Sequence, residues 1–325
     1  MDTLEFMRDD IEEATGITVD IPINKKGAEI LFVVPSGDFV ADPGIYTCMG
    51  YMLLFHELGI DYTWSTYASD GGNFGLFTSH EAMKRLNAKI YAEAERLGVK
   101  WILGGECGHM WRVIHQYMDT LNGPPDFLEV PKSPVTGTVF ENAKSTKMVH
   151  LMEFTADLIK HGKLNLDKSR NDHLSVTLHD SCNPARAMGI LEEPRYVIKN
   201  VCNNFFEMPE NTIREQTFCC GGGAGLGTDE NMEMRLRGGL PRGSAVKYVQ
   251  EQYGVNQLAA MCAIDRATLA TVCDYWAPGV QVTGISELVA NAMILEGEND
   301  RSINLRLEPI PGREPVEDAE GGAGI

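Results

Sequence analysis

Four cysteines give this chain its most specific chemical signal. Each follows an apolar stretch or opens a glycine-rich turn, and together they are Cys182, Cys219, Cys220 and Cys262. Thiolate is the form of cysteine that binds metal, and a helix beginning just after Cys182 or Cys262 would stabilise that charge. Gly221 and Gly222 follow the adjacent pair, and without a Cβ they let backbone N–H groups approach sulfur closely. The pattern predicts a metal centre held by these thiols.

The identity of that centre is open to three interpretations. A single zinc ion accepts four thiolates in a tetrahedral site, but its paired ligands are ordinarily separated by about two to four residues. Two adjacent side chains turn onto one ion with difficulty, whereas a cluster of several iron atoms offers each thiolate a separate target. The pattern therefore favours an iron–sulfur cluster, with zinc and with buried, incidental cysteines as the alternatives.

The segments around these residues predict an α/β protein. Short apolar runs alternate with amphipathic helical patterns, an order typical of parallel sheets. The predicted strands are 29–34, 61–64, 99–103, 174–178 and 257–261, and the predicted helices are 2–14, 47–58, 79–97, 184–191, 196–206, 243–253 and 266–273. Because the carboxyl ends of parallel strands form one crevice, the cysteine segments can converge there.

The two halves of the chain have turn and cysteine motifs at matching positions. The turn at Gly37, the string Ser69-Asp70-Gly71-Gly72 and Cys107 recur about 150 residues later as Cys182, Cys219-Cys220-Gly221-Gly222 and Cys262. We therefore expect two pseudo-repeated Rossmann-like halves with parallel sheets and a cluster near their interface. The expected divisions are a lead-in helix and linker at 1–27, a degenerate first half at 28–130, a second half with the cluster motif at 131–295, and a loose polar tail at 296–325.

Composition narrows the classes of function. With 46 Asp and Glu against 28 Lys and Arg in 325 residues, the net charge is −18, which disfavours binding to nucleic acid or to an anionic membrane surface. The apolar stretches are shorter than the roughly 20 residues that span a bilayer, and the N-terminus lacks a signal-peptide pattern. We expect a cytoplasmic protein without direct membrane insertion, with Cys48, Cys202 and Cys273 in its core.

The cysteine spacing resembles that of a known family. The string Cys182-x36-Cys219-Cys220-Gly-Gly-Gly-x38-Cys262-x2-Asp265 is similar to the cysteine-rich CCG domain. That family includes heterodisulfide reductase B-type subunits, iron–sulfur subunits of glycolate oxidase and anaerobic glycerol-3-phosphate dehydrogenase, and the K subunit of the membrane complex of dissimilatory sulfite reduction. Residues 105–112 and 179–186 look most like the K subunit. Asp265 stands where the family pattern ends in cysteine, and the chain has no two-cluster ferredoxin run like that of K-type subunits.

The resemblance implies one iron–sulfur cluster, of the [4Fe–4S] class, with cubane and non-cubane geometry both open. Cys107 is then a further candidate thiolate, and Asp265 is an oxygen ligand, a group behind the ligands or a helix cap. Four basic side chains lie within a few residues of these positions, where they could donate a proton or stabilise a departing thiolate. They are His109, Arg112, His179 and Arg186.

The implied reaction is reduction of a disulfide or trisulfide, expected to be protein-borne and to belong to sulfur or sulfite metabolism, in two one-electron steps. Implied partners are a ferredoxin-like domain or electron-donor subunit, a membrane quinol-oxidising subunit that would hold the protein at the inner face of the membrane, and a small sulfur-carrier protein with C-terminal cysteines. Two rival functions stay open. One is an electron-relay subunit of a glycolate, lactate or glycerol-3-phosphate dehydrogenase complex, and the other is a structural metal-binding interaction protein.

Overall fold

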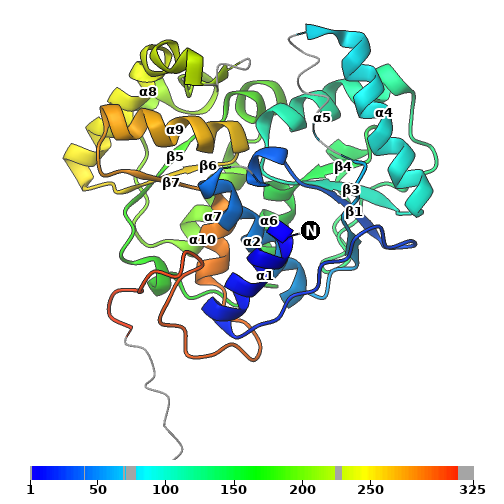
Figure 1. Ribbon diagram of the computed structural model, residues 1–325, viewed down its shortest axis with the longest axis horizontal. Coiled ribbons are helices and arrows are strands. Elements are labelled where there is room, and N and C mark those ends of the chain that lie inside the picture. The colour runs from blue at the N-terminus through cyan, green and yellow to red at the C-terminus, as the bar shows by residue number, and fades with distance from the viewer. Residues whose placement is uncertain (1, 40, 69, 71–77, 224–228, 314–325) are drawn as a thin grey trace, which may run out of the picture.

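Two parallel sheets organise the molecule, and Figure 1 shows them side by side. The computed structural model describes residues 2–39, 41–68, 70, 78–223 and 229–313. The first sheet has the order β2-β1-β3-β4, made of Tyr62–Thr63, Ile30–Val33, Trp101–Gly104 and Met148–His150. The second has the order β5-β6-β7, made of Val176–His179, Gln257–Ala260 and Gln281–Thr283. The predicted α/β class with two parallel sheets is confirmed.

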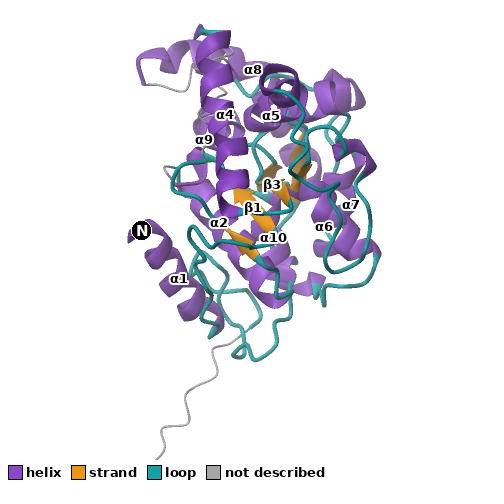
Figure 2. Ribbon diagram, turned by 90° about the vertical axis from the view of Figure 1, so that its right-hand side faces the viewer, coloured by secondary structure: helices purple, strands orange, loops and turns teal. Residues whose placement is uncertain are grey.

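Helices cover both faces of each sheet, which explains why the main strands are continuous apolar runs. Strands β1, β3, β5 and β6 are buried along their whole length. In Figure 1, α8 (Met232–Tyr253) and α9 (Ala263–Trp276) lie on one side of the second sheet, and α7 (Glu192–Val201) and α10 (Ile285–Ala292) lie on the other. The first sheet is flanked, as Figure 2 shows, by α2 (Asp42–Glu57), α4 (His80–Leu97), α5 (Gly108–Asn122) and α6 (Leu151–Lys160), and α1 (Asp2–Thr15) packs against α2.

The two halves have the same order of elements except for β2, which has no counterpart among the strands of the second sheet. The first runs β1, α2, β2, α4, β3, α5, β4, α6, and the second runs β5, α7, α8, β6, α9, β7, α10. Cys107 lies between β3 and α5 just as Cys262 lies between β6 and α9. The inferred duplication therefore corresponds to matching topology. Strand β4 pairs with β3 although it lies beyond the expected division at residue 130, so the first sheet continues past that point.

Small residues let the halves approach closely. A Cβ on Gly50 of α2 would lie 2.4 Å from the carbonyl oxygen of Ser286 in α10. A Cβ on Gly284, just before α10, would lie 2.0 Å from Thr47 Oγ1 of α2. Helices α2 and α10 are therefore in direct contact, and the second half is held firmly against the first.

Part of the segment expected to be a loose tail is packed. Arg301, Leu305 and Ile310 are buried, and Arg301 Nη1 donates to the carbonyl oxygens of Ala290 at 2.9 Å and Met293 at 3.1 Å. These carbonyls belong to the last turn of α10, where no intrahelical partner exists, so the arginine caps the helix from outside. The expectation of a loose terminus is thus wrong for this segment, while residues 314–325 lie outside the described residues.

Candidate metal centre

The four predicted cysteines meet at the carboxyl ends of β5 and β6. The two strands pair in parallel with His179 opposite Ala260, so the loops that carry Cys182 and Cys262 leave the sheet side by side. Burial, together with the charges of Asp265, Cys262 and Cys219, raises the pKa of Cys182 to about 12. The thiols of the second half thus lie within electrostatic reach of one another, and none of the eight cysteines is in a disulfide.

The adjacent cysteines are hydrogen-bonded to each other and are held by backbone donors. The N–H of Gly221 donates to Cys219 Sγ and that of Gly222 to Cys220 Sγ, each at 3.3 Å. The Cys220 thiol hydrogen-bonds to Cys219 and, with the N–H groups of Gly221 and Gly223, lowers the pKa of Cys219 to about 5 despite burial. The same hydrogen bond, and burial, raise the pKa of Cys220. Cys219 is the solvent-exposed member of the pair and Cys220 the buried one.

Two glycines are required where this turn meets the helices. Gly221 has φ +93°, and a Cβ there would lie 2.4 Å from the carbonyl oxygen of Arg235 in α8. A Cβ on Gly222 would lie 2.1 Å from Thr268 Oγ1 of α9. Both residues therefore have to be glycine for α8 and α9 to press on the cysteine turn, and their N–H groups face sulfur as the sequence predicted.

Asp265 lies behind the cysteines in the first turn of α9, where it is 3% exposed. His179 Nε2 is 3.4 Å from Asp265 Oδ2. Burial raises the pKa of Asp265, but the positive charge of His179 and the neighbouring Cys220 thiol outweigh it, so the carboxyl pKa stays below its usual value. The N-cap of α9 is Cys262, which rules out the helix-cap interpretation of Asp265. The carboxylate instead connects His179 with Cys220.

The two arginines predicted to act on substrate lie beside the loops that carry the cysteines. Arg112 Nη1, from α5, donates to Asn183 Oδ1 at 3.2 Å, next to Cys182. Arg186 is exposed and donates to the backbone carbonyl oxygens of Glu215, at 2.8 Å, and Thr217. Arg186 therefore ties the loop after β5 to the segment that leads into the cysteine pair. The side chain of His109 lies outside the described residues.

The first half reaches the thiols through the corner that contains Cys107. Cys107 is 1% exposed and immediately precedes α5. A Cβ on Gly108 would lie 2.7 Å from Pro184 Cδ and 3.5 Å from Cys262 Sγ. The corner is thus in contact with both cysteine loops of the second half. Cys48, Cys202 and Cys273 are buried in the core, as predicted.

Arg242 of α8 is a buried cation that sequence patterns did not identify. It is 0% exposed and donates to Met208 Sδ at 2.8 Å, Thr212 O at 2.6 Å and Thr217 Oγ1 at 2.8 Å. Burial lowers its pKa to about 10, while the charges of Asp180, Asp265 and Cys220 raise it. It therefore remains protonated at neutral pH and offsets negative charge on the cysteines.

A second buried arginine joins the halves beside the same site. Arg266 of α9 is fully buried and forms ion pairs with Asp38 and Glu106, both from the first half. Glu106 also accepts hydrogen bonds from the N–H groups of Ile285 at 3.0 Å and Ser286 at 2.7 Å, at the start of α10. Glu106, next to Cys107, and Arg266, next to Asp265, are therefore fixed relative to each other.

The donor set fits an iron–sulfur cluster. Its ligands are soft thiolates, backbone N–H groups already point at two sulfur atoms, and a buried cation balances charge. Within the described ranges, no three Cys, His, Asp or Glu side chains surround one point closely enough to hold a single metal ion. The thiols are thus near neighbours, not a preformed coordination sphere.

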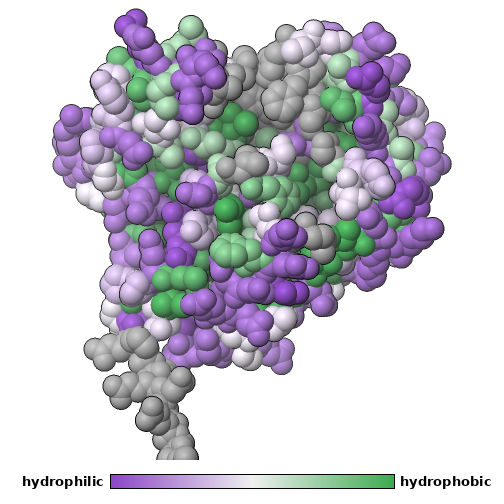
Figure 3. All heavy atoms as spheres, viewed as in Figure 1, coloured by the Kyte–Doolittle hydropathy of each residue, from purple (hydrophilic) through white to green (hydrophobic). Residues whose placement is uncertain are grey.

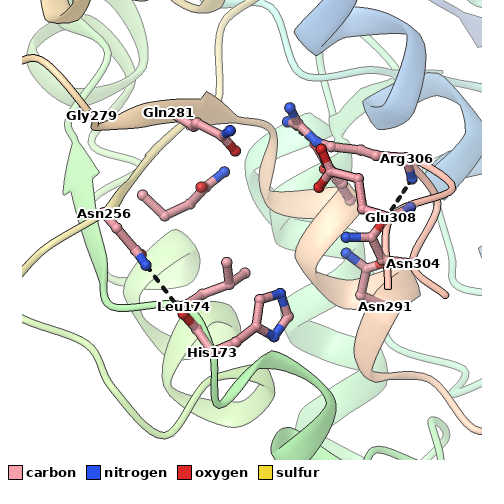
Figure 4. A pocket seen from close by; sticks show the side chains of 11 residues that line it. His173, Leu174, Asn256, Gly279, Gln281, Asn291, Asn304, Arg306 and Glu308 are labelled. Carbon is pink, nitrogen blue, oxygen red and sulfur yellow. Dashed lines mark hydrogen bonds and ion pairs between the residues drawn. The ribbon is translucent and has the colours of Figure 1, made fainter. Parts of the chain in front are cut away.

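A separate pocket lies at the opposite, amino-terminal end of β6 and β7. Figure 4 shows its polar lining, to which Asn256, Gln281, Asn304, Arg306 and Glu308 contribute, around a cavity of about 240 Å³. Cysteine is not among the residues that line it. This pocket is therefore distinct from the thiol site.

Comparison with known proteins agrees with this geometry. Residues 176–263 match the model of the cysteine-rich CCG domain. The chain is 50% identical over 322 residues to the "Hdr-like menaquinol oxidoreductase iron-sulfur subunit" of Archaeoglobus profundus, covering 93% of this chain and 58% of the relative. It is 32% identical over 156 residues to one component of the dihydromethanophenazine:CoB–CoM heterodisulfide reductase of Methanosarcina mazei, covering 46% of this chain and 35% of that one. The chain thus spans less than two thirds of the length of these relatives.

A solved structure supports the fold alone. A hypothetical protein from Helicobacter pylori superimposes with a TM-score of 0.53 at 14% identity, covering 92% of this chain and 55% of that one.

In the described part of the chain, no helix combines the length and the apolar character needed to cross a membrane.

Proposed function

We propose that this chain, with its CCG domain at residues 176–263 and its 50% identity to an Hdr-like menaquinol oxidoreductase subunit, is the iron–sulfur subunit of a heterodisulfide reductase-like oxidoreductase. The observation that carries the proposal is the convergence of Cys182, Cys219 and Cys262, with backbone donors on the Cys219–Cys220 pair. We infer one cluster of the [4Fe–4S] class held by these four thiols, with Cys107 as a further thiolate from the first half.

Such a cluster supplies or accepts single electrons at a potential set by its surroundings. The chain's own groups then have separable roles. The N–H groups of Gly221 and Gly222 and the Arg242 cation stabilise negative charge on sulfur, while Asp265 and His179 hold the buried Cys220. The exposed Cys219 gives a substrate sulfur access to this edge of the site. Arg112, on α5 and hydrogen-bonded to Asn183 next to Cys182, is the basic side chain best placed to meet a thiolate product.

The proposed reaction breaks one S–S bond. Two electrons and two protons enter, and two thiols leave. A disulfide on a small sulfur-carrier protein would reach Cys219 from solvent. The electrons would come from a donor protein or ferredoxin-like domain coupled to a membrane quinol-oxidising partner, which would place the chain at the inner membrane face. The relative at half identity is named for menaquinol and not for sulfite, so a role in sulfite reduction is not part of the proposal.

The test is anaerobic purification followed by iron and sulfide analysis. We expect iron and sulfide in the native protein, and an EPR signal that changes when a thiol is added. Cys182→Ala and Cys219→Ala should lose iron, whereas Cys202→Ala, which removes a thiol buried in the core, should keep it. Protein that folds with zinc and without iron would overturn the proposal. An iron signal that ignores thiols would instead indicate an electron-relay role.

A further inference from the structure

We propose that an apolar pocket in the first half binds the apolar arm of the disulfide substrate. The pocket encloses about 290 Å³ next to the carboxyl ends of β1 and β2. Its walls are largely apolar, and it contains one carboxyl group, Asp70; the wall residues include Ile23, Val34, Phe39, Trp64 and Ala68. The inference rests on the proposed function, because it assigns a substrate arm to the same reaction.

The pocket occupies the place where the first half would carry its own cluster. Strand β1 is the counterpart of β5, and the turn after it, at Ser36 and Gly37, corresponds to the turn that carries Cys182. Asp70 corresponds to Cys220 in the repeat. Ser36 and Asp70 both line the pocket. The cavity therefore lies at a position that corresponds to the one that the second half uses for thiols.

The pocket and the thiol site are neighbours. A Cβ on Gly37 would lie 2.8 Å from the Cβ of Ala263, the residue after Cys262. Burial raises the pKa of Asp70, and the charge of Cys262 raises it further, which places that thiol within electrostatic reach of the pocket. The pocket therefore lies on the Cys262 side of the thiol site.

Asp70 carries an unsatisfied acceptor. The residue is 4% exposed, and its Oδ1 atom is buried with no hydrogen-bond partner among the described residues, while Ser36 hydrogen-bonds to the same carboxyl group. A buried acceptor without a partner costs on the order of 1–3 kcal/mol, so a ligand that donates a hydrogen bond there binds more tightly. The site therefore favours an arm with an amide or hydroxyl donor.

Charge excludes an anionic arm. The pocket contains a carboxyl group and no basic side chain among its lining residues, and the whole chain has a net charge of −18. Figure 3 shows apolar side chains gathered in the middle of the molecular face seen in Figure 1, with polar ones around the margin. The matching substrate class is a disulfide with a neutral, aliphatic or aromatic arm.

The binding experiment uses the anaerobically purified protein and dialkyl disulfides of increasing chain length. Trp64 lines the pocket, so its fluorescence should report occupancy, and Trp64→Phe should lose the signal. We expect the affinity to rise about fourfold for each added methylene until the pocket is full. Ala68→Leu, which fills the pocket, should reduce the affinity for the longer disulfides by about tenfold or more and spare diethyl disulfide. Ala88→Leu, at a half-buried position on α4 outside the pocket, is the matched control.

Adding a terminal hydroxyl to the arm should strengthen binding to the native protein. The gain in affinity should be smaller for Asp70→Asn. Affinity that is independent of chain length, or unchanged in Ala68→Leu, would overturn the proposal even if the enzyme turns over normally. Conversely, intact chain-length dependence of binding in a protein that reduces none of the disulfides would refute the proposed function and leave the pocket assignment as ligand binding only.

Discussion

The contact between the two halves predicts a large loss of stability when Arg266 is replaced by methionine. The guanidinium is fully buried, pairs with Asp38, and approaches Glu106 Oε2 at 3.3 Å and the carbonyl oxygen of Ala260 at 3.0 Å. Methionine fills a similar volume with no charge and no donor. The substitution therefore leaves two buried carboxyl groups without their cation.

The magnitude follows from that burial. Removing one partner of a buried ion pair costs about 3–5 kcal/mol, because the remaining charge stays uncompensated. At roughly 2–4 °C per kcal/mol for a chain of this size class, the midpoint of thermal unfolding should fall by about 6–20 °C. Burial and the charge of Glu106 raise the pKa of Asp38 to about 7 even with Arg266 present. Without the arginine the pKa of Asp38 rises further, so the loss should be larger at alkaline than at mildly acidic pH.

The assay is thermal unfolding followed by circular dichroism under anaerobic conditions at two pH values. Arg214→Met is the matched control, since its pair with Glu192 is 38% and 67% exposed and should be worth less than about 1 kcal/mol. Combining Arg266→Met with Asp38→Asn should recover part of the loss. A midpoint for Arg266→Met within the range of the Arg214→Met control would refute the reasoning.

Two further predictions concern single groups. In iron-free protein at about pH 6, iodoacetamide should alkylate Cys219 before Cys182, because the pKa values are about 5 and about 12 and only Cys219 is exposed; peptide mass spectrometry showing equal rates would contradict this. Burial lowers the pKa of His150 to about 3, whereas the pKa in the unfolded chain is about 6.5. Burial of the neutral imidazole therefore stabilises the fold above about pH 6.5. The free energy of unfolding should fall below that pH by up to about 1.4 kcal/mol per pH unit. His150→Asn keeps a side chain able to cap α6 and should lack this slope in denaturant titrations between about pH 5 and pH 7.

The sequence predicted the elements that have a local signal. Strands β1, β3, β5 and β6 were found because each is an apolar run bounded by turn residues. Strand β4, Met148–His150, was missed because α6 begins directly after it at Leu151, so no turn residue separates the strand from the helical pattern. Helix α10 was missed for a different reason. It has only eight residues, Ile285–Ala292, which is shorter than the roughly 10–12 residues over which a helical period can be recognised.

The site also has features that the sequence could predict and features that it could not. The convergence of Cys182, Cys220 and Cys262 could be expected because parallel strands end at one edge, and the glycine requirement was legible in the turn. The roles of Arg242 and Arg266 could not be expected. Arg266 meets Asp38 across 228 residues of sequence, and no local pattern records a contact of that range.

In this acidic chain, several of the arginine side chains are buried inside the protein. Arg195, Arg242 and Arg266, the arginines packed around the cysteine loops, are each at most 1% exposed. Arg195 pairs with Asp180, Arg266 with Asp38 and Glu106, and Arg242 donates to a sulfur, a carbonyl and a hydroxyl. Their charge is thus consumed inside the protein, where it offsets carboxylates and thiolates. These three arginines are therefore not available to bind a substrate, and an apolar arm beside a single buried acceptor is the interaction that the pocket in the first half can offer.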